Sequence, residues 1–240
     1  EAVETSRAQV ASVLGCETGE VIFTSGGTES DNLALIGVAE ADVRLRRHII
    51  TTAIEHHAVL FAARALAARG FDVTELSVDS SGRVSGSELE ASLRSDTLLV
   101  SIGLANNEIG TVQDLPELAR LVHKAGALIH TDAVQAAAQM DINVDRLEVD
   151  LLSLAAHKFY GPKGVGVLYV RDGVALERYA HGGMQERGRR SGTENVAGIV
   201  GLATALMRAN EMRESRVEHF RTLSAKLATC VTSGYPQARL

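Results

Sequence analysis

Short apolar runs alternate with amphipathic segments along most of the chain. The runs predict buried strands at residues 21–24, 48–53, 71–78, 97–104, 127–129, 149–154 and 164–170. Apolar residues at helical spacing predict helices at residues 1–14, 28–41, 55–69, 87–93, 115–124, 194–213 and 217–231. Strand, helix and strand alternate in this way in βαβ units. The pattern therefore predicts an α/β fold built around a mainly parallel sheet.

Charged side chains follow two of the predicted strands. Asp132 comes just after the run at residues 127–129, and His157 and Lys158 come just after the run at residues 149–154. Ligands of open α/β sheets bind beyond the carboxyl ends of the strands, so these groups could share a site. Pyridoxal 5′-phosphate requires a lysine amine that forms a Schiff base with its aldehyde and a carboxylate that keeps its ring nitrogen protonated. Asp132 and Lys158 fit these roles, although a loop-capping aspartate and a solvated lysine explain the two residues taken alone.

Two glycine-rich segments could face an anion. Gly26 and Gly27 lie between a predicted strand and a predicted helix, where backbone N–H groups and the helix dipole favour negative charge. This segment predicts either a phosphate cradle or a plain strand-to-helix turn. The segment at residues 181–193 is polar and basic, and is either a mobile surface loop or a second phosphate-facing one. The adjacent His56 and His57 lack zinc-site spacing, so a zinc site is not expected. The histidine at this strand end is either a capped surface residue or one that stacks on a planar cofactor.

Composition and charge narrow the class of protein. The 240 residues are 45% hydrophobic and 22% charged, as in ordinary globular proteins. A net charge of -6 argues against binding to nucleic acid or to a membrane surface. Cys16 and Cys230 have neither metal-ligand spacing nor the pattern of a disulfide framework, which favours a cytoplasmic protein.

Six motifs, taken in order, resemble the cysteine desulfurases that serve iron–sulfur cluster assembly, in the class V aminotransferase superfamily of fold-type I pyridoxal-phosphate enzymes. The motifs are TSGGTESDN at 24–32, EH at 55–56, NNEIG at 106–110, DAVQ at 132–135, HKFYGPKG at 157–164 and RGRRSGT at 187–193. The resemblance runs nearly end to end. It implies a three-layer sandwich whose central sheet of about seven strands has helices on both faces. It also implies a cofactor-binding large domain at residues 1–214, without the family's N-terminal segment, and the start of an incomplete C-terminal domain at residues 215–240.

The resemblance implies roles for individual residues. Lys158 would be the Schiff-base lysine, Asp132 the partner of the ring nitrogen and Gln135 a donor to the ring oxygen. His56 would stack on the ring and act with Lys158 in proton transfer. The remaining roles concern the phosphate and the substrate: Gly27, Thr28 and His157 would hold the phosphate, Asn107 would lie beside the ring and the substrate carboxylate, and Thr193 would reach the phosphate bound in the other subunit of a homodimer. The resemblance implies no metal site.

The implied reaction converts L-cysteine to L-alanine and leaves the sulfur as a persulfide on an enzyme cysteine, for transfer to an iron–sulfur scaffold or another acceptor protein. The chain departs from the family at Ala155, where a serine hydroxyl would hold the phosphate, and Ser153 is a poor replacement. The family's sulfur-accepting cysteine lies beyond the helix after Thr193, so we expect it outside this chain and expect Cys16 and Cys230 to be incidental. The chain alone is then expected not to complete the reaction. Alternatives are a selenocysteine lyase, an aminotransferase of the same class, and a non-catalytic dimerisation or scaffold-binding fragment.

Overall fold

A computed structural model of the chain describes residues 1–178, 180–235 and 237–238. Its centre is a sheet of seven strands in the order β1-β7-β6-β5-β4-β2-β3. The strands are β1 (Val21–Thr24), β2 (His48–Thr52), β3 (Asp72–Leu76), β4 (Thr97–Ser101), β5 (Leu128–Asp132), β6 (Leu151–Ala155) and β7 (Gly166–Val170). From β3 to β6 neighbouring strands run parallel, whereas β7 is antiparallel to both β6 and β1. The predicted mainly parallel sheet is confirmed.

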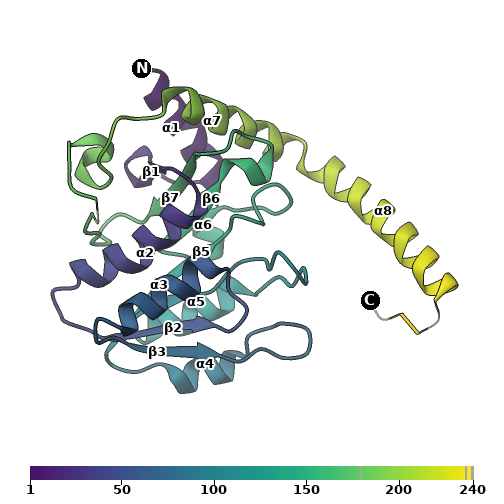
Figure 1. The fold of residues 1–240 in the computed structure, drawn as a ribbon, viewed down its shortest axis with the longest axis horizontal. Coiled ribbons are helices and arrows are strands. Elements are labelled where there is room, and N and C mark those ends of the chain that lie inside the picture. Colours follow the sequence, from purple (N-terminus) through teal and green to yellow (C-terminus); the bar gives the residue numbers. More distant parts are fainter. Residues whose placement is uncertain (179, 236, 239–240) are drawn as a thin grey trace.

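Helices cover both faces of this sheet (Figure 1). The α-helices are α1 (Ala2–Leu14), α2 (Gly27–Ala41), α3 (His57–Ala67), α4 (Gly86–Ser92), α5 (Leu115–Lys124), α6 (Val144–Leu147), α7 (Val196–Glu211) and α8 (Arg213–Gly234). Three short 3₁₀ turns are η1 (Thr18–Glu20), η2 (Ala156–Phe159) and η3 (Gln185–Gly188). Among the described residues, none of these helices combines the length and the apolar character that crossing a bilayer requires.

Two apolar cores lie on opposite faces of the sheet. Successive strand residues point to opposite faces, so Leu151 packs with α2 and α3 while Leu152 packs with α1, α5 and α7. Ile49 and Ile50 divide in the same way. Because both faces are covered, β2, β4, β6 and β7 are buried throughout. The predicted three-layer sandwich is therefore confirmed.

The predicted element boundaries hold with small corrections. β4 ends at Ser101 and not at Leu104, although the backbone of Leu104 still donates a hydrogen bond to Asp132. The short helix α6 was not predicted, because four residues are too few to show helical spacing. α7 begins after Asn195, whose side chain accepts a hydrogen bond from the Gly198 backbone, two residues later than expected.

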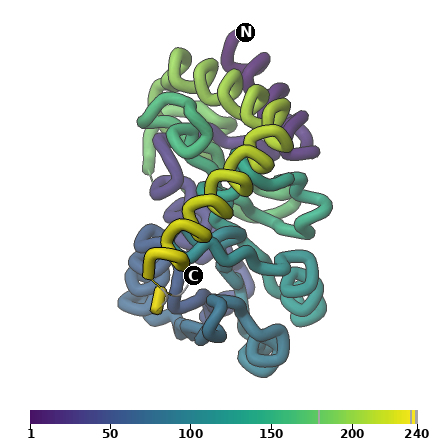
Figure 2. Tube along the Cα trace, turned by 90° about the vertical axis from the view of Figure 1, so that its right-hand side faces the viewer, coloured from purple at the N-terminus to yellow at the C-terminus, as the bar shows by residue number. Residues whose placement is uncertain are grey.

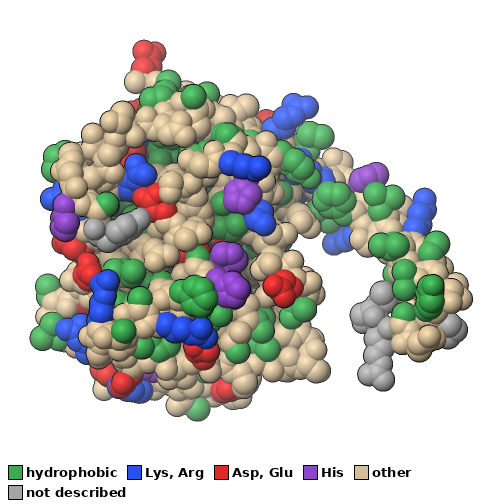
Figure 3. Space-filling model, in the orientation of Figure 1, with side chains coloured by type: hydrophobic (Ala, Val, Ile, Leu, Met, Phe, Trp, Pro, Cys, Tyr) green, Lys and Arg blue, Asp and Glu red, His purple; other side chains and the backbone are tan. Residues whose placement is uncertain are grey.

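The last helix stands apart from the body of the molecule. α8 follows α7 after a break at Met212 and projects away from the sheet (Figure 1). Seen from the side, it runs diagonally in front of the body (Figure 2). None of its residues is buried, and hydrophobic side chains including Phe220 and Leu227 are exposed along it (Figure 3). The domain boundary at residues 214/215 stays a prediction, and residues 236, 239 and 240 of the proposed C-terminal segment lie outside the described residues.

Candidate active site

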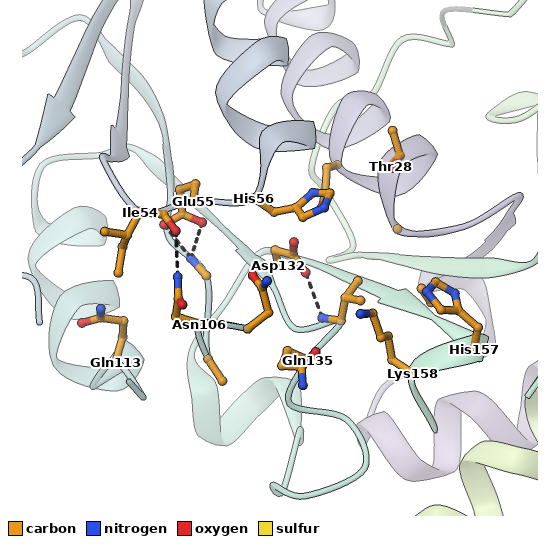
Figure 4. Close-up of a pocket in the computed structure, with 17 residues that line it drawn as sticks. Thr28, Ile54, Glu55, His56, Asn106, Gln113, Asp132, Gln135, His157 and Lys158 are labelled. Carbon is orange, nitrogen blue, oxygen red and sulfur yellow. Dashed lines mark hydrogen bonds between the residues drawn. The ribbon is translucent and has the colours of Figure 1, made fainter. Parts of the chain in front are cut away.

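A cavity of about 290 Å³ opens where β5 and β6 end and where α2 and α3 begin. Its walls bring together most of the predicted site residues (Figure 4): Gly27, Thr28, His56, Asn107, Asp132, Gln135, His157 and Lys158. Thr193 is the one predicted residue that does not border it. Residues from five separate stretches of sequence thus converge on one space.

Asp132 and Lys158 reach the cavity from neighbouring parallel strands. Asp132 is the last residue of β5 and pairs with Ser153 of β6, while Lys158 lies in η2 directly after β6. The Lys158 side chain points into the cavity (Figure 4). Burial raises the pKa of Asp132, and a hydrogen bond from the Val134 N–H at 2.9 Å, together with the charges of His56 and Lys158, opposes the rise. The predicted meeting of a carboxylate and an amine is therefore present.

His56 caps a helix and lines the cavity at once. It is the N-cap of α3, and its Nδ1 accepts a hydrogen bond from the Ala58 N–H at 3.1 Å. This bond leaves Nε2 as the ring nitrogen that can exchange a proton with a ligand. His57, next in sequence, instead stacks on Phe61 with 5.1 Å between the ring centroids. The N-cap role of His56 was not predicted from the sequence, and stacking on a cofactor remains a prediction.

The start of α2 has the backbone geometry of an anion cradle. Gly26 has φ +154°, a conformation that side chains other than hydrogen rarely permit, and it turns the chain from β1 into the 15-residue helix α2. A Cβ atom on Gly27 would lie 2.8 Å from Cγ2 of Val134, so a larger residue would push into the cavity wall. Free N–H groups of the first turn and the helix dipole favour an anion here. The phosphate role of Gly27 and Thr28 remains a prediction.

Ala155 supplies no hydroxyl at this end of the cavity. An ideal Cβ on Gly27 would lie 3.6 Å from the Ala155 Cβ, so the methyl group stands beside the cradle. Ser153 cannot replace the missing hydroxyl, because its Oγ lies 2.9 Å from Nε2 of buried His130 and is itself buried. His157 borders the cavity, and its burial and the charges of Lys158 and Lys163 lower its pKa. The structure thus supports the expectation that Ser153 is unavailable.

Asn107 is held in place by its neighbour. The Asn106 Oδ1 accepts hydrogen bonds from the backbone N–H groups of Glu108 at 2.8 Å and Ile109 at 3.0 Å. The Asn106 Nδ2 donates to the carbonyl oxygen of Ile54 at 2.8 Å. All of these bonds fix the turn after β4, so Asn106 orders the loop that presents Asn107 to the cavity.

Two acidic residues of the cavity were missed by the sequence reasoning. Asp31 and Glu55 both border it, in addition to Asp132. The Glu55 carboxylate accepts hydrogen bonds from Thr52 Oγ1 at 2.7 Å and from the Gly103 N–H at 3.0 Å. Burial raises the pKa of Glu55 to about 7 against these bonds, and Asp132 adds to the rise. Both residues lie inside the quoted motifs, and Asp31 follows Thr28 by three positions, which places it on the same face of the helix.

Thr193 borders a separate hollow of about 80 Å³ beside β1. The loop that carries it is tied to its own chain: Arg190 Nε donates to the Glu29 carboxylate at 2.8 Å, and the Glu29 carboxylate also accepts from the Ser25 N–H at 2.6 Å. The structure therefore does not bring Thr193 to the other eight predicted residues within one chain. A role in a second subunit remains a prediction.

Neither cysteine borders the cavity. Cys16 is half-buried after α1, where burial, together with the charges of Glu20, Glu17 and Asp145, raises the pKa of its thiol to about 12. Cys230 is exposed on α8. A thiol with so high a pKa holds little of the nucleophilic thiolate near neutral pH.

Comparisons with known proteins identify similar chains. The family model "Aminotransferase class-V" matches residues 1–239. The chain is 45% identical over 240 residues to "Cysteine desulfurase IscS" of Clostridium botulinum strain Hall. The aligned region covers 100% of this chain and 60% of that protein. It is 49% identical over 226 residues to "Putative cysteine desulfurase IscS 1" of Bacillus subtilis, and this aligned region covers 94% of the chain and 60% of that protein.

Solved structures of similar proteins superpose on the chain over most of its length. A "NIFS-LIKE PROTEIN" superposes with a TM-score of 0.94 at 46% identity, over 97% of this chain and 64% of that one. "SspA in complex with cysteine" superposes with a TM-score of 0.82 at 42% identity, over 85% and 60%. The chain thus spans about 60% of the length of the curated relatives it matches.

Proposed function

The chain belongs to the aminotransferase class-V family, and from this premise we propose that it is the cofactor-binding part of a cysteine desulfurase acting on L-cysteine. The similar curated proteins are named cysteine desulfurases, which favours this function over a selenocysteine lyase or an aminotransferase. Pyridoxal 5′-phosphate is the cofactor of such enzymes. The observation that carries the proposal is the pair of Asp132 and Lys158 on adjacent strand ends within one cavity.

The residues of the cavity fit this cofactor chemically. Asp132 offers a carboxylate to a protonated ring nitrogen, and Lys158 offers an amine to an aldehyde. The glycine-lined start of α2 offers N–H groups to a phosphate, and it has room only because Gly27 lacks a Cβ. Gln135 and Asn107 add amide groups to the walls. Each functional group of the cofactor therefore has a partner of matching chemistry.

The proposed chemistry divides among the chain's own residues. When bound, the cofactor supplies an electron sink for bonds at the substrate Cα. Asp132 would hold the proton on the ring nitrogen, because a carboxylate favours a protonated nitrogen that donates a hydrogen bond to it. The Lys158 amine or Nε2 of His56 takes the proton from the substrate Cα, since Nδ1 of His56 is already bonded to Ala58.

The second half of the reaction needs a thiol that accepts the sulfur and so releases L-alanine. Neither Cys16 nor Cys230 borders the cavity, so we assign this role to a cysteine outside the residues described here. The sulfur would then pass to an iron–sulfur scaffold or another acceptor protein. We also propose a homodimer in which Thr193 serves the partner's phosphate. The two free cysteines favour the cytoplasm.

Titration with pyridoxal 5′-phosphate tests the proposal. We expect wild type to gain the visible absorbance band of a lysine-bound cofactor and expect L-cysteine to shift that band. Lys158→Ala should lose the band, because Lys158 is the lysine that borders the cavity. Lys163→Ala is the matched control and should keep it, since Lys163 is exposed outside the cavity walls. Borohydride reduction that places the label on Lys163 would contradict the assignment.

A further inference from the structure

Asp31 is a buried acidic residue close to Asp132. It lies on α2 and is 1% exposed. One carboxylate oxygen of Asp31, one of Asp132 and one ring nitrogen of His56 all lie within 4.8 Å of one another. Oδ1 of Asp31 has no hydrogen-bond partner among the residues that the structure describes. A buried carboxylate oxygen left without a partner is costly, and a second carboxylate nearby adds repulsion.

Buried His130 does not neutralise Asp31. Nδ1 of His130 lies 2.8 Å from Ser101 Oγ, and its Nε2 lies 2.9 Å from Ser153 Oγ and 3.7 Å from Oδ1 of Asp31. Burial lowers the pKa of His130 to about 3, so the ring stays neutral. The contacts between Asp31 and β5 and β6 therefore bring no positive charge.

The remaining charged groups lie on the cavity side. Glu55 is acidic and adds to the repulsion, while the charges of His56 and Lys158 act on Asp132. Burial, then the charge of Asp132, raises the pKa of Asp31 well above its ordinary value, although a hydrogen bond with Ser153 opposes the rise. A protonated carboxyl group has one O–H to donate, which an ionised one lacks.

We propose that Asp31 is a positioning residue for Asp132: it carries a proton in the folded protein and donates it in a hydrogen bond to the Asp132 carboxylate. The two acids then present one negative charge to the cavity, which matches one protonated ring nitrogen. Oδ1 of Asp132 is already bonded to the Val134 N–H, so both ends of the Asp132 carboxylate are held. That this arrangement favours cofactor binding rests on the proposed function. That Asp31 carries a proton does not rest on it.

The pH dependence of stability tests the proton. In the unfolded chain Asp31 loses its proton above about pH 4, whereas the folded chain keeps it. The stability that this proton contributes is therefore fully present at low pH and is lost as the pH rises. The loss is at most about tenfold in the folded-to-unfolded ratio per pH unit. Asp31→Asn keeps an N–H donor of the same shape without this proton. Between pH 5 and 7 we expect wild type to lose up to about 100-fold more of that ratio than Asp31→Asn.

The matched control is Asp172→Asn, which removes an exposed carboxylate and should keep the wild-type slope. Equal slopes in wild type and Asp31→Asn would overturn the proposal.

Infrared spectroscopy of the wild type with ¹³C-labelled aspartate requires no variant to fold. We expect the carbonyl band of a protonated aspartic acid to persist at pH 7, and its absence would also overturn the proposal. Zn²⁺ binding by the cofactor-free chain that Asp31→Asn abolishes would show that a cation, and not a proton, neutralises the pair.

Cofactor affinity tests the positioning role separately. Asp31→Asn should bind pyridoxal 5′-phosphate within about threefold of wild type, whereas Asp31→Ala, which lacks a donor, should bind it about tenfold more weakly. Equal affinity of Asp31→Ala and wild type would refute the positioning role. Wild type that shows the infrared band but binds no cofactor would instead count against the proposed function. The two failures are therefore distinguishable.

Discussion

Ala155 lies beside the start of α2, at the position where the desulfurase resemblance implies a serine. Its Cβ borders the site of Gly27, and no other hydroxyl of β6 is free, because Ser153 is engaged with His130. With Ala155 at this position, β6 therefore offers no free hydroxyl to this end of the cavity.

Ala155→Ser should tighten the binding of pyridoxal 5′-phosphate. A hydrogen bond to a charged group contributes about 1.5–3 kcal/mol, which corresponds to roughly 10- to 150-fold in the dissociation constant. The measurement is a fluorescence or absorbance titration of both proteins. Pyridoxal, which lacks the phosphate, is the control ligand and should bind both equally. A gain with pyridoxal as large as that with its phosphate would show that the new hydroxyl does not face the phosphate.

At the scale of elements, a buried ion pair joins the N-terminal helix to the loop before α7. Arg7 of α1 and Glu186 of η3 form two hydrogen bonds, of 2.7 Å and 2.9 Å, with both side chains almost fully buried. Arg7 also donates to the Val21 carbonyl at 2.9 Å, and Glu186 accepts from the Phe23 N–H at 2.9 Å. The pair thus fastens α1 and η3 to the edge strand β1, next to the loop that carries Thr193.

Arg7→Met should destabilise the chain strongly. It leaves the buried Glu186 carboxylate without its charged partner, which costs about 3–5 kcal/mol in the free energy of unfolding. The matched control is Arg69→Met, which breaks an exposed pair with Glu40 and should cost less than about 1 kcal/mol. Denaturant unfolding measures both. Adding Glu186→Gln to Arg7→Met should restore part of the loss, because the unpaired charge is removed. Similar losses in Arg7→Met and Arg69→Met would show that the buried pair does not hold the loop.

At the scale of the whole molecule, both cysteines lie outside the walls of the cavity. Cys16 follows α1, and Cys230 lies on the projecting helix α8 (Figure 1). The cavity residues come instead from strand ends and helix starts in the body. The cavity and the thiols of this chain are therefore spatially separate.

Replacing both cysteines, by Cys16→Ser together with Cys230→Ser, should leave the spectral response to L-cysteine unchanged. We expect the wild-type chain itself to show that response without sustained release of L-alanine, since no thiol borders the cavity. Alanine release with and without a reductant is the measurement. Sustained release that the double replacement abolishes would show that one of these cysteines accepts the sulfur.

Sequence alone determined that strands and helices alternate and that Asp132 and Lys158 lie at strand ends. Both features are local, because the side-chain period and the length of an apolar run set them within a few residues. The glycines before α2 were readable for the same reason, since a tight turn into a helix depends on adjacent positions.

Only the tertiary structure decided which elements became neighbours. It placed β7 antiparallel between β1 and β6, brought Gly103 to Glu55, and paired Arg7 with Glu186 across 179 positions of sequence. It also turned Asp31 toward Asp132, because the face of α2 that meets the sheet depends on how the helix packs. Contacts between distant segments depend on strand order and helix orientation, and no local pattern of residues specifies either.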